Sequence, residues 1–196
     1  MELIQICKNA KTAERAFAKV KTAVKNEVLE KTAERLQAQA DFILGENEKD
    51  LANAREKQMP DALVDRLILT KERIDQMAQG LKQIVGLDDP IGEVLGMKQR
   101  PNGLLIGRKR VPLGVVGIIY ESRPNVTADA FGLCFKTSNV VILKGGSDAI
   151  HSNLAIVSCI QDVLKEEGLD PNMIQIISDT DRKTTSEFMK MNQYVD

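Results

Sequence analysis

Residues 140–148 read VVILKGGSD, and the fold predicted for this chain is built around them. Four consecutive apolar residues, three of them β-branched, end in a lysine that is followed at once by Gly-Gly-Ser. A short apolar run of this kind is typical of a strand buried in a parallel sheet. The Gly-Gly-Ser turn is typical of the start of the next helix. The stretch therefore predicts a strand over 139–143 that carries Lys144 to the edge of a sheet.

Strands and helices alternate on both sides of this stretch. Apolar runs predict further strands over 104–106, 114–119 and 173–177. Helices are expected over 126–137, over 148–167, and from Asp179 or Thr180 to Met191. The helix over 148–167 has one apolar face, formed by Ile150, Leu154, Val157, Ile160 and Leu164. The alternation predicts an α/β fold, a parallel sheet with crossover helices, in which the strand over 114–119 is covered on both faces.

The first hundred residues have a helical pattern instead. One apolar stripe steps by four and three residues through Leu29, Ala33, Leu36, Ala40 and Ile43. Gly45 is expected to bend or end that helix, and Asp61 to cap the next one. Thr70 is expected to cap a further helix that ends near Gly86. Residues 87–103 are rich in turn residues and separate this helical region from the sheet.

Composition excludes several classes of function. The chain has 196 residues, 43% hydrophobic and 28% charged, with a formal net charge of −1, so no overall field attracts nucleic acid or a membrane. Three cysteines and one histidine argue against a disulfide framework and a metal site. No apolar run has the length of a signal peptide core or a membrane span, so we expect a cytoplasmic protein. The one basic run, 108–110, is expected to be a solvated strand edge.

Polar residues follow three of the expected strands. The segment 120–125, Lys144 and Ser178 all stand at carboxyl ends, where parallel sheets bind ligands, so they predict one shared crevice. Two common phosphate loops are excluded. Lys144 precedes the glycines rather than following them, and no Gly-x-Gly-x-x-Gly occurs in the chain.

Residues 111–127, VPLGVVGIIYESRPNVT, resemble the signature of the γ-glutamyl phosphate reductase family, in the aldehyde dehydrogenase superfamily. The match continues through 136–146, KTSNVVILKGG, and includes RPNGL at 100–104. The resemblance implies an aldehyde-dehydrogenase-like cofactor-binding domain over 1–196, with a helical region at 1–90 and a sheet region at 103–196. It also implies NADPH-dependent reduction of L-glutamyl 5-phosphate to L-glutamate 5-semialdehyde and phosphate, the second step of proline biosynthesis. In that chemistry a cysteine thiolate displaces phosphate and hydride reduces the thioester.

The resemblance assigns the cofactor side of the site. Lys144 would hydrogen-bond the adenosine ribose, with Gly145 and Gly146 in the turn. Ser147 stands where NAD-preferring members often carry glutamate, so NADPH (and NADP) is the expected cofactor. Further cofactor contacts are expected from Tyr120, Glu121 and Ser178. Two structural alternatives stay open: Lys144 could reach solvent, and Ser147 could cap the following helix.

The substrate side is assigned in the same way. Arg123 and Ser122 are expected to bind substrate, Arg123 through its guanidinium; its alternative is an ion pair with Glu121 or Asp129. Asn125 is the candidate donor to the oxyanion, and helix capping is its alternative. Aligning the prolines of the superfamily places Ser122 at that position instead of Asn125, so both remain candidates.

None of Cys7, Cys134 and Cys159 fits the nucleophile, because each falls in an expected helix without a cationic neighbour. Family members are about twice as long, so we expect the catalytic domain to be absent and the fragment to be inactive alone. The implied partners are the small-molecule substrate, glutamate 5-kinase and further copies in a homo-oligomer, with no nucleic acid or membrane. Two other functions stay open: an acylating aldehyde dehydrogenase with a different acyl substrate, and a non-catalytic nucleotide-binding or assembly module.

Overall fold

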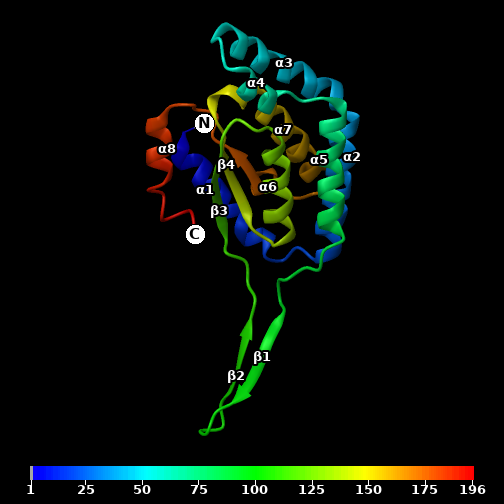
Figure 1. The fold of residues 1–196 in the computed structure, drawn as a ribbon. Helices are drawn as coiled ribbons and strands as arrows, with labels where there is room; N and C mark the ends of the chain where they lie inside the picture. Colours follow the sequence, from blue (N-terminus) through cyan, green and yellow to red (C-terminus); the bar gives the residue numbers. More distant parts are fainter. Residues whose placement is uncertain (1) are drawn as a thin grey trace.

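The computed structural model describes residues 2–196, and its centre is a parallel sheet (Figure 1). The strands are β3 (Val115–Ile119), β4 (Val140–Lys144) and β5 (Ile174–Ile176), in the order β3-β4-β5. The crossovers are α6 (Asn125–Lys136) and α7 (Ile150–Glu166), with short 3-10 turns η1 (Ser147–Ala149) and η2 (Pro171–Met173). Helices α6 and α7 lie on one face of the sheet and α1 (Leu3–Phe17) lies on the other. The α/β fold with a helical start is therefore confirmed.

The strands differ in how completely they are covered. Every residue of β4 is buried, as the run of apolar residues predicts. Strand β3 pairs only with β4 among the described residues and lies at the edge of the sheet. Its Gly117 and Ile119 are exposed, Ile119 to 48%. The expectation that 114–119 is covered on both faces holds except at Ile119, since Val116 and Ile118 pack against the core and a Cβ on Gly117 would lie 2.8 Å from the Phe188 ring.

The helical region consists of α1, α2 (Thr22–Ala38), α3 (Ala40–Glu56), α4 (Asp61–Leu67) and α5 (Lys71–Val85). The apolar stripe from Leu29 to Ile43 is fully buried, but it runs across two helices that meet at Gln39. Gly45 lies inside α3, so its expected role as a helix end is wrong. Thr70 caps α5 as predicted, accepting a hydrogen bond from the Arg73 N–H at 3.2 Å.

Two further helix boundaries differ from expectation. Pro60, not Asp61, occupies the cap position of α4. Helix α8 (Arg182–Phe188) is capped by Asp181, whose carboxylate accepts from the Lys183 N–H, rather than by Asp179 or Thr180. In α7, Leu154 is 39% exposed, because the buried face is centred on Ile156 and Ile160 instead.

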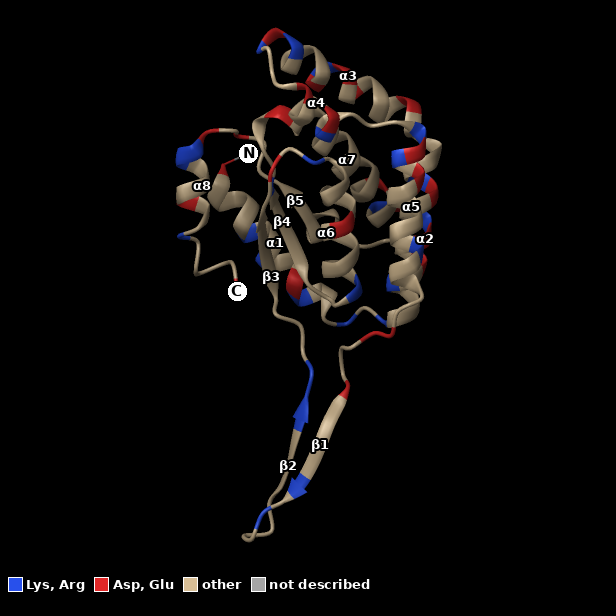
Figure 2. Ribbon diagram, in the orientation of Figure 1, with Lys and Arg blue, Asp and Glu red and all other residues tan. Residues whose placement is uncertain are grey.

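A β-hairpin projects away from the rest of the molecule (Figure 1). It consists of β1 (Val94–Gln99) and β2 (Leu105–Lys109), paired antiparallel. All residues of both strands are exposed, including Arg108 and Lys109 on the basic part of β2 (Figure 2), as expected of a solvated strand. Strand β1 was not predicted, because a ribbon without a buried face has no alternating pattern and because Gly92 and Gly96 indicate turns.

The helical region and the sheet region share one apolar core. A buried lysine, Lys25 on α2, ties them together where α6 ends. Its ammonium donates to the Lys136 carbonyl and to the Ser138 hydroxyl, each at 2.9 Å, and forms an ion pair with Asp89. The expected single domain over 1–196 stays a prediction. No helix of residues 2–196 is long and apolar enough to cross a membrane.

Candidate functional site

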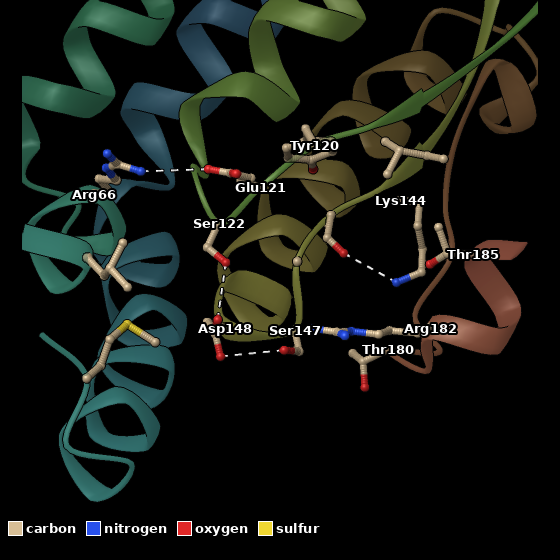
Figure 3. A pocket seen from close by; sticks show the side chains of 15 residues that line it. Arg66, Tyr120, Glu121, Ser122, Lys144, Ser147, Asp148, Thr180, Arg182 and Thr185 are labelled. Atoms are coloured by element: carbon tan, nitrogen blue, oxygen red, sulfur yellow. Dashed lines mark hydrogen bonds and ion pairs between the residues drawn. The ribbon is translucent and has the colours of Figure 1, made fainter.

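A pocket of about 510 Å³ opens beyond the carboxyl ends of β3 and β4 (Figure 3). It brings together most of the residues that the sequence proposed for the cofactor and Ser122 from the substrate side. The predicted residues that line it are Tyr120, Glu121, Ser122, Lys144, Gly145, Gly146 and Ser147. Parallel pairing explains their proximity, since Ile119 at the end of β3 lies opposite Lys144 at the end of β4. The position of the pocket follows the general rule for parallel sheets.

Lys144 lies at the floor of this pocket. It is only 4% exposed, so the alternative that its side chain reaches solvent is wrong. Its ammonium makes one long hydrogen bond, to the Gly145 carbonyl at 3.4 Å. No carboxylate of residues 2–196 forms an ion pair with it. A hydrogen bond from Thr184, and to a smaller extent the charge of Lys144, lower the pKa of Asp179, so this carboxylate lies near the ammonium without pairing with it. An ammonium carries three donors, so Lys144 has unused hydrogen-bonding capacity for an anionic or hydroxyl ligand.

Positive charge is concentrated at one end of the pocket. The two acids that line it are paired, Asp148 with Lys57 at 3.1 Å and Glu121 with Arg66 at 3.7 Å. Lys144 and Arg182 have no such pair in the described part of the chain. The hydroxyl groups of Ser147, Thr180 and Thr185 line the pocket beside them (Figure 3). This end therefore suits a phosphate or a ribose, whereas the Glu121 end is close to neutral.

The two glycines are required by close packing. A Cβ on Gly145 would lie 2.5 Å from the Asn153 amide nitrogen, and a Cβ on Gly146 would lie 2.6 Å from the Ser122 hydroxyl. The turn after β4 thus packs directly against the turn after β3. A side chain at either glycine position would push the two turns apart. Both turns must keep this contact for the pocket to have its shape.

Tyr120 turns its hydroxyl away from the pocket. The phenol lies 2.7 Å from the Thr127 hydroxyl, which in turn donates to the Asn153 side chain at 3.0 Å. Burial raises the pKa of Tyr120 to about 12, against a smaller opposing effect of the Thr127 hydrogen bond. Tyr120 therefore offers a neutral ring to the pocket, not an acid or a base.

Ser147 does not cap the helix that follows it. The first amides of α7 are satisfied by Asp50 of α3, which accepts from the N–H of His151 at 3.1 Å and the N–H of Ser152 at 2.8 Å. Ser147 itself has only a 3.5 Å contact with Asp148. The alternative that Ser147 caps this helix is therefore wrong, and the carboxylate of Asp50 already occupies the amino end of α7. The exposed hydroxyl of Ser147 is left available to the pocket.

Three predicted residues lie elsewhere. Ser178 lines a separate pocket with Gln175, so the expected shared crevice includes the ends of β3 and β4 but not Ser178. Arg123 is exposed and forms no ion pair with Glu121 or Asp129, so its structural alternative is wrong. Asn125 is the first residue of α6 and makes no capping hydrogen bond. It lies in a second pocket, next to the first.

Sequence reasoning missed two walls of the pocket. Arg182, Thr180 and Thr185 come from the loop after β5 and the start of α8, and Arg66 comes from α4. The polar residues after β5 follow a strand end, so the rule that found Lys144 could have found them. No local signal links α4 to the sheet, because its contact with the site depends on how the helical region packs.

The three cysteines of the sequence are buried away from the pocket. Burial raises the pKa of Cys134 and of Cys159 to about 11. Burial also raises the pKa of Cys7. These thiols are protonated near neutral pH and cannot reach a ligand in the pocket, in agreement with the sequence.

Residues 1–195 match the model of the aldehyde dehydrogenase family, and the chain belongs to that family. Membership and the nucleotide-binding fold together imply a nicotinamide cofactor. Within the family, the chain is 56% identical over 194 residues to the γ-glutamyl phosphate reductase of Lachnospira eligens, a match that covers 99% of this chain and 47% of that protein. The resemblance seen in residues 100–150 is thereby confirmed.

Solved structures agree. The crystal structure of γ-glutamyl phosphate reductase from Thermotoga maritima superposes with a TM-score of 0.96 at 41% identity, over 100% of this chain and 47% of that one. The enzyme from Saccharomyces cerevisiae gives 0.89 at 30% identity, over 100% and 50%. The chain thus spans about half the length of the relatives it matches.

Proposed function

We propose that the chain supplies the cofactor-binding portion of an NADPH-dependent enzyme that reduces L-glutamyl 5-phosphate to L-glutamate 5-semialdehyde and phosphate, in proline biosynthesis. One observation carries the cofactor part: a buried Lys144 shares one end of the pocket with Arg182, and neither forms an ion pair within residues 2–196. The likeness to proteins named γ-glutamyl phosphate reductase supports the substrate.

The donors at the Lys144 end fit the ribose 2′-phosphate that distinguishes NADPH from NADH. Lys144 and Arg182 would supply charge, and Ser147 and Thr180 would supply hydroxyl donors. Because Ser147 has no negative charge, it does not repel a phosphate as glutamate at this position would. When bound, the nicotinamide supplies the hydride of the reduction. Gly145 and Gly146 would let the cofactor approach the backbone between β3 and β4.

The substrate side rests on the turn between β3 and α6. Ser122 lies in the cofactor pocket, and its hydroxyl donates to Asp148 at 3.4 Å. Asn125 lies in the neighbouring pocket, so both candidates for the oxyanion donor flank the same turn. We propose Arg123 as an exposed contact to the phosphate group. The nucleophilic thiolate is assigned to no cysteine of this chain, because all three are buried with raised pKa values.

The hairpin supports the expected homo-oligomer of the full-length enzyme. Its two strands expose large apolar side chains on a ribbon that touches little of its own chain: Val94, Leu95, Met97, Leu105 and Ile106. Exposed apolar patches of this kind mark interfaces. The partnership with glutamate 5-kinase and the cytoplasmic location stay predictions.

The test is a titration of the chain into NADPH, followed by the fluorescence of the cofactor, with NADH as the control. The chain has no Trp to contribute to the signal. We expect saturable binding of NADPH, and a loss of about tenfold or more in Lys144→Met, the scale of one charged hydrogen bond. Lys165→Met, which removes an exposed lysine from α7, is the matched control. Equal affinity for NADH and NADPH would contradict the proposed cofactor.

A further inference from the structure

A second pocket, of about 340 Å³, lies between α5 and the start of α6. It adjoins the cofactor pocket, because Arg66 lines both. The turn after β3 separates the two, with Glu121 and Ser122 facing one pocket and Pro124 and Asn125 facing the other. A molecule in the second pocket therefore lies next to whatever occupies the first. The proposed function leaves this pocket unused except for Asn125.

One side of this pocket carries an acidic residue that forms no ion pair with a lysine or arginine of residues 2–196. Asp129 on α6 is half-buried, and its carboxylate accepts one long hydrogen bond, from the Asn125 amide at 3.4 Å. Burial raises the pKa of Asp129, against the smaller opposing effect of that hydrogen bond. No lysine or arginine of residues 2–196 forms an ion pair with it. A partly desolvated carboxylate of this kind is stabilised by a ligand that brings a positive charge.

The pocket also contains two arginines, which are held differently. The guanidinium of Arg73 already donates hydrogen bonds within the protein, to the carbonyls of Asp65 at 2.6 Å and Ile68 at 2.7 Å. Within residues 2–196, Arg66 forms one ion pair, with Glu121 at 3.7 Å, which is beyond hydrogen-bonding distance. Both side chains of this pair are largely exposed, 45% and 86%, so the pairing is weak. The guanidinium of Arg66 is therefore available to a carboxylate of a ligand.

We propose that this second pocket binds the α-amino-acid end of the acyl substrate, with Asp129 contacting its ammonium group and Arg66 its carboxylate. The proposal rests on the proposed function, because it assumes a glutamyl substrate. The match is one of charge: the pocket offers one unpaired acid and one weakly paired base, and the substrate end carries one of each. The acyl carbon, at the far end of the glutamyl chain, would then point past the 121–125 turn toward the cofactor pocket. Asp129 and Arg66 are specificity-determining residues in this account.

The test uses small probes and a spectroscopic readout that needs no activity. L-glutamate 5-methyl ester carries both charged groups, monomethyl glutarate lacks the ammonium, and methyl 4-aminobutanoate lacks the carboxylate. Each is titrated into the isotope-labelled chain while backbone amide resonances of 73–77 and 125–129 are followed by NMR. We expect the methyl ester to bind at least about tenfold more tightly than either of the other two, since each removes one charged contact.

Two variants assign the contacts. Asp129→Asn should abolish the preference of the methyl ester over monomethyl glutarate and keep its preference over methyl 4-aminobutanoate. Arg66→Gln should do the reverse. Asp75→Asn, an exposed acid on α5 outside the pocket, is the matched control and should change neither preference. Circular dichroism verifies that each variant is folded, and Asp129→Asn changes little in shape.

The outcomes separate this proposal from the function on which it rests. If the wild-type chain binds the methyl ester no better than monomethyl glutarate, or binds no probe, the subsite is wrong, even where NADPH still binds. If the variants leave the preferences unchanged, the assignment to Asp129 and Arg66 is wrong. If the probes bind as expected while NADPH does not, the subsite stands and the proposed cofactor is wrong.

Discussion

Asp50 on α3 and Ser152 on α7 are joined by two hydrogen bonds to one carboxylate oxygen, 2.8 Å from the Ser152 N–H and 2.6 Å from its hydroxyl. Both residues are buried, to 1% and 0% exposure. The helical region thus caps the crossover helix that follows the Lys144 turn. Asn47, one turn earlier on α3, donates to the same Ser152 hydroxyl at 2.9 Å.

Asp50→Ala should destabilise the chain by roughly 2–4 kcal/mol, because it leaves three donors of α7 without an acceptor in a buried place. The free energy of unfolding in urea measures this. Asp41→Ala is the control: it removes an exposed acid at the start of α3 that forms an ion pair with Lys71, and it should cost less than about 1 kcal/mol. If the two variants lost similar amounts of unfolding free energy, the buried hydrogen bonds of Asp50 would contribute no more than an exposed ion pair.

Gly145→Ala should lower both stability and NADPH affinity, because its Cβ would lie 2.5 Å from the Asn153 side chain. Overpacking of this size typically costs about 1–3 kcal/mol. Gly45→Ala provides the contrast: no atom lies within 4 Å of its Cβ and it sits inside α3. We expect Gly45→Ala to stabilise the chain by about 0.5–1 kcal/mol through helix propensity. Thermal unfolding of the two variants should therefore shift in opposite directions.

Ser147→Glu tests the selectivity of the cofactor pocket. A carboxylate next to Lys144 and Arg182 should repel a 2′-phosphate and accept ribose hydroxyls instead. We expect NADPH affinity to fall by about tenfold or more and NADH affinity to fall less or to rise, measured by cofactor fluorescence. Ser147→Gln, which has similar size but no charge, separates repulsion from bulk. An equal loss for both cofactors would place Ser147 away from the 2′ position.

The buried cysteines predict a loss of stability at alkaline pH. Folding raises the pKa of Cys134 and Cys159 from about 9 to about 11, so both states hold the proton below pH 9. Between pH 9 and 11 only the unfolded thiols lose it, and stability falls as pH rises. Urea unfolding at pH 7 and pH 10 measures the fall, to which other groups also contribute. The double variant Cys134→Ala, Cys159→Ala should show a smaller fall; an unchanged one would contradict the assignment to these thiols.

Patterns among residues close together in the sequence were sufficient to predict much of the sheet. The run before Lys144 predicted β4 and the turn after it, because a buried strand and a glycine turn each depend on neighbouring residues. The same reasoning brought Tyr120 and Lys144 into one pocket, since parallel strands end at one edge. Features that depend on distant residues were missed. Asp50 lies about a hundred residues from the amides it caps, and Arg66 comes from a helix with no sequence link to the sheet.

The projecting hairpin has a consequence for motion. A two-stranded ribbon without a buried face is at best marginally stable in water, so its order depends on what packs against it. In the separate chain its backbone amides should exchange hydrogen with solvent quickly, whereas those of β4 exchange only on global opening. Protection of β1 and β2 would therefore report assembly directly, residue by residue, without any measurement of mass or size.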